Sequence, residues 1–214
     1  MRVLVVAATS FEVESLKSKV ESQDFGLKTF DLEFLITGVG MVATAFALGK
    51  HLAPHQYDLA INLGIAGSFD RSIALGEVVE IIVDGFSELG AEDDEEFLSI
   101  EQLGFGEGNF KPSARLYDYG ITNLRQVSAI TVNTVHGNDV SIQKLAYRIS
   151  PQLESMEGAA FFYACKQADL PCLQIRAVSN YVEKRNRDAW EISLAIKNLN
   201  TFAAELLREV VRNT

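Results

Sequence analysis

The residues best placed to do chemistry in this sequence are a few acids and amides that stand beside apolar runs. Glu157 is the clearest case, because it directly precedes residues 158–165, a run of small and aromatic residues that indicates a buried helix. A carboxylate kept from water can stabilise positive charge that develops on a bound molecule. It can equally be a helix N-terminal acid held by the helix dipole. The sequence at Glu157 alone is compatible with both interpretations.

Other such residues follow short apolar runs rich in Val, Ile and Leu, which indicate buried strands. Since ligands of parallel α/β sheets bind at the carboxyl ends of strands, the residues just after these runs are candidates for a site. The candidates are Glu12, Gly38, Val39, Gly40, Gly64, Ile65, Ala66, Gly67, Met156, Glu157, Ser179 and Asn180.

The elements that must position these residues alternate along the chain, which predicts one α/β domain over residues 1–214, with a three-layer, doubly wound and mostly parallel sheet. The predicted strands are residues 3–8, 33–37, 59–63 (ending at Gly64), 78–83, 127–132 and 173–178. The first predicted helix follows a Thr9 or Ser10 cap and contains Val13, Leu16 and Val20. Further helices are predicted over residues 42–52, over residues 142–149 and in the run after Gly158. The last predicted helix, about residues 188–211, has an apolar stripe facing the core that consists of Leu199, Phe202, Leu206 and Val210.

Residues 84–120 interrupt this alternation. They contain the acidic stretch GAEDDEEF, several glycines and Pro112, without a clear period. Long irregular segments in compact domains tend to be functional or mobile. We therefore expect a lid or an interface arm in this part of the chain.

The stretch GVGMVA, residues 38–43, has the G-x-G-x-x-A form of a dinucleotide-binding turn, and Asp58 follows at a suitable distance. That turn belongs on the first strand of a nucleotide-binding half, however, and the first strand here ends in AATSFE. We therefore interpret it as a tight glycine turn that lets a helix pack close to the sheet. No nicotinamide, flavin or other cofactor is expected.

Charge and composition argue against several classes of protein. The formal net charge of −10 disfavours nucleic acid as a partner. No apolar stretch approaches the roughly 20 residues of a membrane span, and the apolar start is too short for a signal peptide, so we expect no membrane partner and a cytoplasmic location. Cys165 and Cys172 are expected to be reduced core residues. His51, His55 and His136 lack metal-ligand spacing, so no metal site is expected.

Four stretches taken together resemble the nucleoside phosphorylase/nucleosidase superfamily. They are VAATSFEVE (residues 6–14), INLGIAG (61–67), SMEGA (155–159) and RAVSN (176–180). Their order and spacing are similar to the hydrolase branch, which includes the methylthioadenosine/S-adenosylhomocysteine nucleosidases. SMEG, VSN and the following YVEKRNRDAW are most similar to the futalosine hydrolase family, which removes hypoxanthine from futalosine on a menaquinone pathway. The resemblance implies an enzyme whose partner is a small nucleoside.

The resemblance also implies roles for the acids and for Arg176. Glu157 would accept hydrogen bonds from the ribose hydroxyls, and Met156 would pack against the sugar. Glu12 would be the general base that activates water, and Arg176 would help to orient that base and the water. Judged from the residues alone, Glu12 can also be a first-turn surface acid. Arg176 is as readily a partner in a structural ion pair.

At the base end, Asn180 stands where nucleosidases specific for 6-aminopurines have an aspartic acid. An amide cannot give up a proton, but it offers a donor and an acceptor, which suit O6 and a protonated N7 of a 6-oxopurine. A turn-forming asparagine is the alternative interpretation. Ser179, main-chain groups of Ala66 and Gly67, and the Val135 side chain are expected to line the base and the ribose.

Two further positions concern the water and the 5′ end of the substrate. Ile65 departs from the adenine nucleosidases, which place a serine there near the attacking water. Trp190 matches an aromatic residue at the 5′ end, where it would stack on the benzoate-bearing arm of futalosine, although a lone Trp at a helix start is as readily a core residue. The candidate cations for the benzoate are Arg71, Lys184, Arg185 and Arg187.

Three other functions stay open from the sequence. A purine nucleoside phosphorylase needs an anion site, which the acidic first loop AATSFEVE disfavours because it would repel a dianion. An adenine-specific nucleosidase is disfavoured by Asn180. A nucleoside-binding protein without turnover is disfavoured because Glu12, Glu157 and Arg176 are present together. The resemblance implies a homodimer or a larger homo-oligomer.

Overall fold

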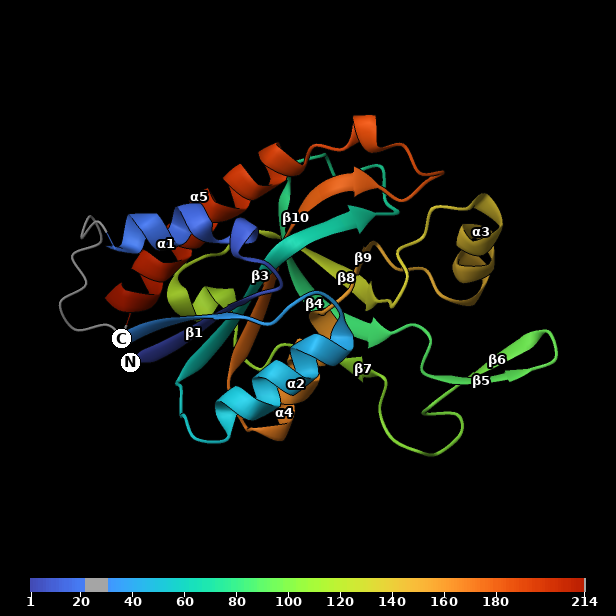
Figure 1. Cartoon of the computed structure of the whole chain (residues 1–214), viewed down its shortest axis with the longest axis horizontal. Coiled ribbons are helices and arrows are strands. Elements are labelled where there is room, and N and C mark those ends of the chain that lie inside the picture. The colour runs from blue at the N-terminus through green and yellow to red at the C-terminus, as the bar shows by residue number, and fades with distance from the viewer. Residues whose placement is uncertain (22–30, 214) are drawn as a thin grey trace.

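The alternation of strands and helices expected from the sequence is present in the computed structural model, which describes residues 1–21 and 31–213 (Figure 1). The strands are β1 (Arg2–Ala7), β2 (Asp31–Ile36), β3 (Leu59–Ser68), β4 (Val78–Phe86), β5 (Gly90–Asp93), β6 (Glu96–Ser99), β7 (Asn109–Phe110), β8 (Arg125–Thr131), β9 (Leu153–Ser155) and β10 (Cys172–Tyr181). The α-helices are α1 (Glu14–Glu21), α2 (Met41–Leu52), α3 (Asp139–Arg148), α4 (Gly158–Gln167) and α5 (Ile192–Arg212). Three short 3-10 turns are η1 (Ser10–Glu12), η2 (Leu116–Tyr119) and η3 (Arg187–Ala189).

One mixed sheet forms the centre of the molecule, and most of its neighbouring strands run parallel, as predicted. β1 pairs in parallel with β2 and β3, β3 with β10, and β8 with β4 and β9. The pairs β10–β4, β3–β9 and β4–β7 are antiparallel. Because β10 pairs with both β3 and β4, the strands β3, β10, β4, β8 and β9 close into a ring, which the alternation of elements did not predict.

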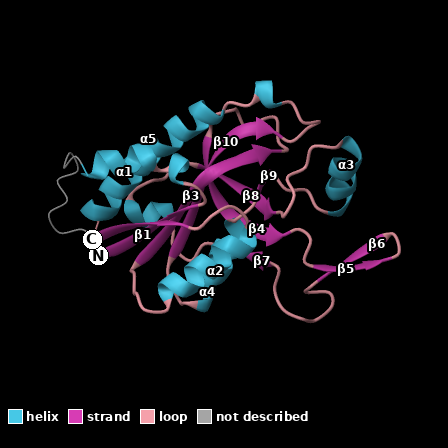
Figure 2. Ribbon diagram, viewed as in Figure 1, coloured by secondary structure: helices cyan, strands magenta, loops and turns pink. Residues whose placement is uncertain are grey.

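Helices cover both faces of the sheet and complete the three predicted layers, with α1 and α5 on one side and α2 and α4 on the other (Figure 2). The first strand explains why. Val3 and Val5 belong to the core cluster on the side of α1 and α5, whereas Leu4 and Val6 belong to the cluster on the side of α2 and α4. Successive side chains of a strand point to opposite faces, so a continuous apolar run is buried on both.

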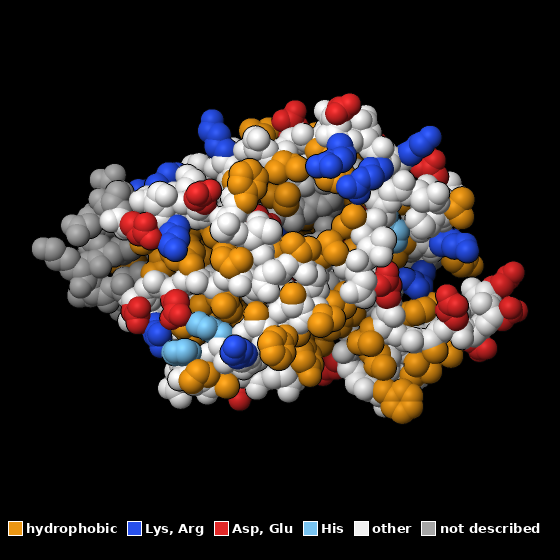
Figure 3. All heavy atoms as spheres, in the orientation of Figure 1, with side chains coloured by type: hydrophobic (Ala, Val, Ile, Leu, Met, Phe, Trp, Pro, Cys, Tyr) orange, Lys and Arg blue, Asp and Glu red, His pale blue; other side chains and the backbone are white. Residues whose placement is uncertain are grey.

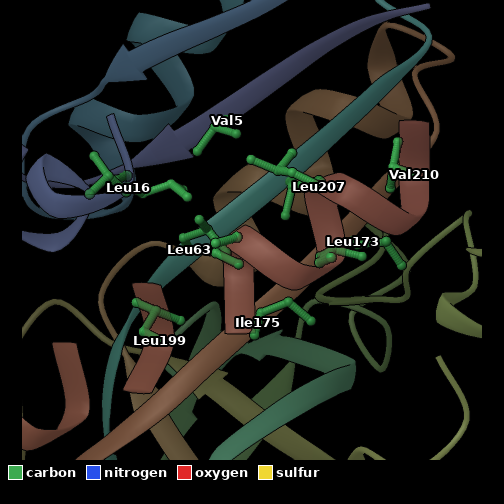
Figure 4. Close-up of a cluster of buried hydrophobic side chains, with 14 of the residues drawn as sticks. Val5, Leu16, Leu63, Leu173, Ile175, Leu199, Leu207 and Val210 are labelled. Atoms are coloured by element: carbon green, nitrogen blue, oxygen red, sulfur yellow. The ribbon is translucent and has the colours of Figure 1, made fainter. Parts of the chain in front are cut away.

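The last helix, α5, packs the predicted apolar stripe into the first of these clusters (Figure 4). Leu199, Leu206 and Val210 are fully buried, and Phe202 is partly buried against the same cluster. None of the described helices is long and apolar enough to span a membrane.

The start of α5 differs from the prediction. The helix begins at Ile192 and not at residue 188. The preceding turn η3 ends at Ala189, and Trp190 then takes an extended backbone with φ −87° and ψ 130°. Trp190 therefore lies on the connection between β10 and α5, where its side chain is not committed to the core stripe.

The predicted end of β3 at Gly64 is wrong, because the strand continues to Ser68. The ladder between β3 and β10 continues as well, and pairs Ser68 with Tyr181. Gly64 is required within the strand for another reason: a Cβ there would lie 1.8 Å from Nη1 of Arg176. This glycine marks the close approach of a side chain to the backbone.

The segment over residues 84–120 is more regular than predicted. It contains the end of β4, the β5–β6 hairpin, β7 and η2. Asp94, in the turn between β5 and β6, adopts the left-handed conformation with φ 55°. The hairpin projects away from the central sheet (Figure 1).

Candidate active site

A cavity of about 340 Å³ lies at the carboxyl ends of β1, β3 and β10. These three strands are parallel neighbours, so their carboxyl ends meet at one edge, as expected for a ligand site in an α/β sheet. Larger hollows of about 720 Å³ and 860 Å³ lie elsewhere, and neither is lined by a residue predicted for the site. Figure 3 shows Lys and Arg side chains gathered on the surface near the ends of β3 and β10.

Nearly all of the residues proposed from the sequence meet at this cavity. Glu12 comes from η1, Glu157 from the residue before α4, and Asn180 from the end of β10. The predicted residues that line it are Glu12, Ala66, Gly67, Val135, Met156, Glu157, Ser179, Asn180 and Trp190, and Ile65 lines it too. Among the residues given a catalytic or binding role, Arg176 is the exception, since it lies behind the wall of the cavity with 1% of its surface exposed. Of the other residues that follow predicted strands, Val39 lines the cavity, whereas Gly38, Gly40 and Gly64 do not.

Glu12 is held by hydrogen bonds at both carboxylate oxygens. Oε2 accepts from the backbone N–H of Thr9 at 2.9 Å, which is the contribution of the Glu12 side chain to a capping box at η1, and it also accepts from the Thr9 hydroxyl at 3.1 Å. Oε1 accepts from the backbone N–H of Ile65 on β3 at 3.3 Å. The side chain is 8% exposed, so Glu12 is not a surface acid. Its carboxylate faces the cavity from a fixed position.

Glu157 is held by the backbone in the same way. Oε1 accepts from the N–H of Gly40 at 3.0 Å, and Oε2 accepts from the N–H of Met156 at 3.3 Å. Gly38 and Gly40 both have positive φ, 85° and 99°, which glycine adopts readily. The GVGMVA stretch is thus a glycine turn, and it aims one backbone donor at the carboxylate that the sequence singled out.

Arg176 belongs to a buried polar network. Its Nε and Nη2 donate to Oε1 of Gln174 at 3.2 Å and 2.9 Å, and Nη2 donates to Oδ1 of Asn62 at 2.6 Å. Gln174 in turn donates to Oδ2 of Asp84 at 3.0 Å. Arg176 and Glu12 both approach Gly64, but no ion pair joins them among the described side chains.

Asp84 is the acid of this network. It is fully buried, and the loss of water raises its pKa from 3.8 to about 6. The hydroxyl of Thr131 donates to its Oδ1 at 2.8 Å and also accepts from the N–H of Ala159 at the start of α4. The network therefore connects β4, β8 and β10 to the helix that follows Glu157.

The amide of Asn180 is oriented by its neighbour. The hydroxyl of Ser179 donates to Oδ1 of Asn180 at 2.8 Å, and Nδ2 of Asn180 donates to the backbone oxygen of Tyr181 at 3.1 Å. Ser179 is also within 3.2 Å of the backbone oxygen of Ala66. Each end of the amide keeps one further site for a hydrogen bond to a ligand.

The four cations named for the benzoate differ in their surroundings. Arg185 lines the cavity, and its Cζ lies 5.0 Å from the centre of the Trp190 ring. Arg187 lies 6.0 Å from the same ring but does not line the cavity. Arg71 pairs with Glu183, and Lys184 is exposed outside the cavity.

Among the lining residues that the sequence did not single out for this site, His136 and Glu154 form a hydrogen-bonded pair. The N–H and Nδ1 of His136 bond to the carboxylate of Glu154 at 3.0 Å and 2.7 Å. Glu154 is only 3% exposed, and its burial raises its pKa. Glu154 lies on β9, a strand of three residues that no periodic pattern predicts.

Both cysteines are free and buried, as expected. Within residues 1–21 and 31–213, no group of three or more His, Cys, Asp or Glu side chains is arranged to hold a metal ion.

Comparisons with known proteins point to one family. The family described as the phosphorylase superfamily matches residues 2–212. A futalosine hydrolase of Thermus thermophilus is 30% identical over 191 residues, covering 86% of this chain and 84% of that protein. A futalosine hydrolase of Streptomyces coelicolor is 34% identical over 182 residues, covering 81% of this chain and 77% of that protein.

Solved structures share the fold at lower identity. A methylthioadenosine/S-adenosylhomocysteine nucleosidase of Colwellia psychrerythraea in complex with adenine has a TM-score of 0.79 and 22% identity, covering 98% of this chain and 95% of that one. A futalosine hydrolase mutant of Helicobacter pylori has a TM-score of 0.81 and 13% identity, covering 100% of both chains.

Proposed function

The chain belongs to the phosphorylase superfamily, and we propose that it is a nucleosidase that hydrolyses futalosine to hypoxanthine and dehypoxanthine futalosine. The observation that carries this proposal is that Glu12, Glu157 and Asn180 open onto one cavity. The similarity to curated futalosine hydrolases over most of the chain supports the choice of substrate.

Glu157 holds the ribose in this proposal. Its two oxygens each accept one backbone N–H and retain capacity for the 2′- and 3′-hydroxyls, while Met156 packs against the sugar. As the N-glycosidic bond breaks, the sugar becomes oxocarbenium-like and positive. A buried carboxylate stabilises that charge more than it stabilises the neutral substrate, so the interaction accelerates the reaction.

Glu12 is the general base. It takes a proton from a water molecule whose oxygen forms the new bond to the anomeric carbon, while the bonding electrons of the N-glycosidic bond leave with the purine. The purine takes up one proton from solvent water at N7, and Glu12 returns its proton to solvent, so the overall reaction adds one water molecule. The three hydrogen bonds from Thr9 and Ile65 fix the direction of this carboxylate. Arg176 acts from behind the wall, where its guanidinium and the Glu12 carboxylate both approach Gly64, and its charge helps to orient the base and the water.

Asn180 receives the departing base. With Oδ1 bonded to the Ser179 hydroxyl, the amide presents N–H to O6 and C=O to a protonated N7. Main-chain groups of Ala66 and Gly67 and the side chain of Val135 complete the surface around the purine and ribose. An amide in this place favours a 6-oxopurine over adenine.

Trp190 and Arg185 are proposed to bind the benzoate-bearing arm. Both line the cavity, and the guanidinium of Arg185 lies against the Trp190 ring. The ring can stack on the benzoate ring, and the guanidinium can pair with its carboxylate. Arg185 is therefore the preferred cation among the four named from the sequence.

The protein is further proposed to act as a homodimer or larger homo-oligomer. An apolar hollow joins α2 to the segment that follows the β5–β6 hairpin, and Figure 3 shows apolar side chains along this face. Phe46 on α2 and Phe105 after the hairpin are 73% and 79% exposed. Exposed apolar residues that adjoin one hollow mark an interaction surface, which favours an interface arm over a lid for this segment.

The proposed location is the cytoplasm, and the proposed pathway is menaquinone biosynthesis. Two buried thiols that are free are consistent with a reducing compartment.

An assay of base release separates this proposal from its rivals. Purified protein is incubated with futalosine, inosine or methylthioadenosine, with and without phosphate, and the free base is measured by chromatography. The proposal expects hypoxanthine from futalosine without phosphate. A strict phosphate requirement would instead indicate a phosphorylase, preferred turnover of methylthioadenosine would indicate an adenine nucleosidase, and nucleoside binding without turnover would indicate a binding protein.

A further inference from the structure

The pair His136–Glu154 is built into the wall of the cavity, although the reaction proposed above gives it no task. Both residues line the cavity. Glu154 is nearly inaccessible, and both of its oxygens bond to His136, one to the backbone N–H and one to Nδ1. A buried acid is costly unless it is paired, so this arrangement holds the imidazole in a fixed orientation.

The far nitrogen of that imidazole is left for a ligand. Within residues 1–21 and 31–213, no side chain or backbone group hydrogen-bonds to Nε2 of His136. When Nδ1–H is donated to the Glu154 carboxylate, the neutral ring carries a lone pair on Nε2. His136 then presents an acceptor, and Glu154 fixes the tautomer that makes it one.

The pair lies at the same end of the cavity as Asn180. A Cβ placed on Gly67 would be 3.2 Å from Nδ2 of Asn180 and 3.5 Å from Cγ of Glu154. The backbone partner of Gly67 across the β3–β9 ladder is Glu154 itself. The amide and the acid of the pair therefore approach the same side of one glycine, where the Val182 side chain also packs at 3.0 Å from that Cβ position.

The chemistry of purines decides what such a pair can recognise. In a 6-oxopurine, O6 stands between N7 and N1, and N1 carries a proton. In adenine, N1 carries a lone pair. If Asn180 meets the N7 and O6 side, the next atom along the edge is N1. An acceptor there bonds to N1–H of a 6-oxopurine and opposes the lone pair of adenine.

We propose that Nε2 of His136 accepts the N1–H of a 6-oxopurine and that Glu154 positions it, which makes the pair a determinant of base specificity. This inference rests on the proposed function, because it assigns the base subsite of that same cavity. Rejection of adenine then has two sources, the amide of Asn180 and the acceptor at position 136. A site that loses a paired hydrogen bond discriminates strongly, because its buried polar group is left without a partner.

Calorimetric binding of free bases tests the pair without any need for turnover. The wild-type protein, His136→Ala, Glu154→Gln and the control His55→Ala are titrated with hypoxanthine, 1-methylhypoxanthine and adenine. His55 is the matched control because its ring bonds to the backbone of His51 and does not line this cavity. Thermal melting of each variant checks that it is folded.

The wild-type protein and His55→Ala are expected to bind hypoxanthine more tightly than adenine and more tightly than 1-methylhypoxanthine. In His136→Ala the ratio of hypoxanthine to adenine affinity should fall by about 10- to 100-fold, the range for one hydrogen bond to a buried polar partner. The penalty for the 1-methyl group should shrink in the same variant. Glu154→Gln should lower the ratio less, because the imidazole remains but its tautomer is no longer fixed.

A folded His136→Ala protein with the wild-type ratio would overturn the inference. If His136→Ala does not fold, Glu154→Gln decides, and an unchanged ratio there overturns it equally. Base release from futalosine by the wild-type protein is measured in parallel. Turnover with an unchanged ratio refutes only the role of His136, whereas a shifted ratio without turnover supports that role and refutes the proposed reaction.

Discussion

At the scale of single residues, the site depends on two carboxylates that are kept in place by backbone N–H groups. Glu12 and Glu157 each receive such bonds at both oxygens; the donors are Thr9 before η1 and Ile65 of β3 for Glu12, and Gly40 of the glycine turn and Met156 for Glu157. Backbone donors cannot swing away as side chains do, so the two acids are fixed before a ligand enters. Fixed charges of this kind cost no reorganisation during the reaction.

Glu12→Gln tests the general base. The amide keeps the size of the side chain but cannot take a proton from water, so kcat should fall by about 10²- to 10⁴-fold while the affinity for futalosine is retained. Steady-state kinetics and calorimetric binding measure the two quantities. Glu14→Gln, an exposed acid in the first turn of α1, is the matched control and should behave as wild type. A Glu12→Gln protein with wild-type kcat would refute the assignment.

Glu157→Gln tests the sugar contact. Loss of the charge should lower kcat/KM for futalosine by about 10- to 100-fold, because hydrogen bonds to a charged group and the stabilised sugar cation are both weakened. Affinity for free hypoxanthine should be unchanged, since the base has no contact with this residue in the proposal. Equal losses for nucleoside and free base, measured by kinetics and calorimetry, would show that Glu157 only maintains the shape of the cavity.

At the scale of elements, close packing behind the cavity fixes the start of α4. A Cβ on Gly158 would lie 2.0 Å from Oδ2 of Asp84 and 2.1 Å from Oε1 of Gln174. Both of these side chains are fully buried and hydrogen-bonded, so neither can move aside at low cost. The glycine that follows Glu157 therefore lets the helix approach the buried network.

Gly158→Ala should reduce the free energy of unfolding by about 1 to 3 kcal/mol or more, the usual cost of overpacking a core. Gly49→Ala is the control, because Gly49 lies on α2 with no atom within 4 Å of the added Cβ. Alanine is preferred in helices, so this control should gain up to about 1 kcal/mol. Denaturant unfolding measures both, and equal stability of the two variants would contradict the packing described here.

Asp84 should make stability depend on pH in a definite direction. Its pKa is 3.8 ordinarily and about 6 in the folded protein, so the folded state binds the proton more tightly. The stabilisation that this protonation gives the folded state is fully present below pH 3.8 and is lost as the pH rises to about 6. Relative to Asp84→Asn, the free energy of unfolding of the wild-type protein should therefore fall by on the order of 3 kcal/mol as the pH rises across this window. A difference that is constant with pH, measured by chemical denaturation, would contradict a raised pKa.

The sequence predicted elements well where one local pattern decided them. The unbroken apolar residues of β1 and the stripe on α5 indicated their burial correctly. Prediction from the sequence failed where the structure of one element depends on another element. Strand β3 continues through Gly64 because β10 pairs along it. The ring of strands closes because β10 pairs with both β3 and β4.

The same reason explains what was missed in the site. Glu12 comes shortly after β1 and Asn180 lies at the end of β10, both within motifs that the sequence displays, and so they could be named in advance. His136 and Glu154 meet only because the segment after β8 returns to β9, a strand too short to show a period. The partners of Arg176 likewise come from separate strands.

At the scale of the whole molecule, the proposed self-association depends on the apolar face beside α2. Phe46→Glu should shift the protein toward monomer, because a charge would be buried in the interface. Light scattering after size-exclusion chromatography measures the mass. Tyr147→Glu is the control, since Tyr147 is 97% exposed on α3, away from this face. The same assembly mass for Phe46→Glu as for wild type would place the interface elsewhere.

In the proposed reaction, water attacks a nucleoside that is held between two fixed acids and an amide. The most direct measurement is turnover of futalosine in phosphate-free water enriched in the heavy oxygen isotope, followed by mass spectrometry of both products. The expected products are free hypoxanthine without the label and a sugar that carries the heavy oxygen at the anomeric carbon. Absence of base release at micromolar protein, or release only with phosphate and a phosphorylated sugar, would contradict this reaction.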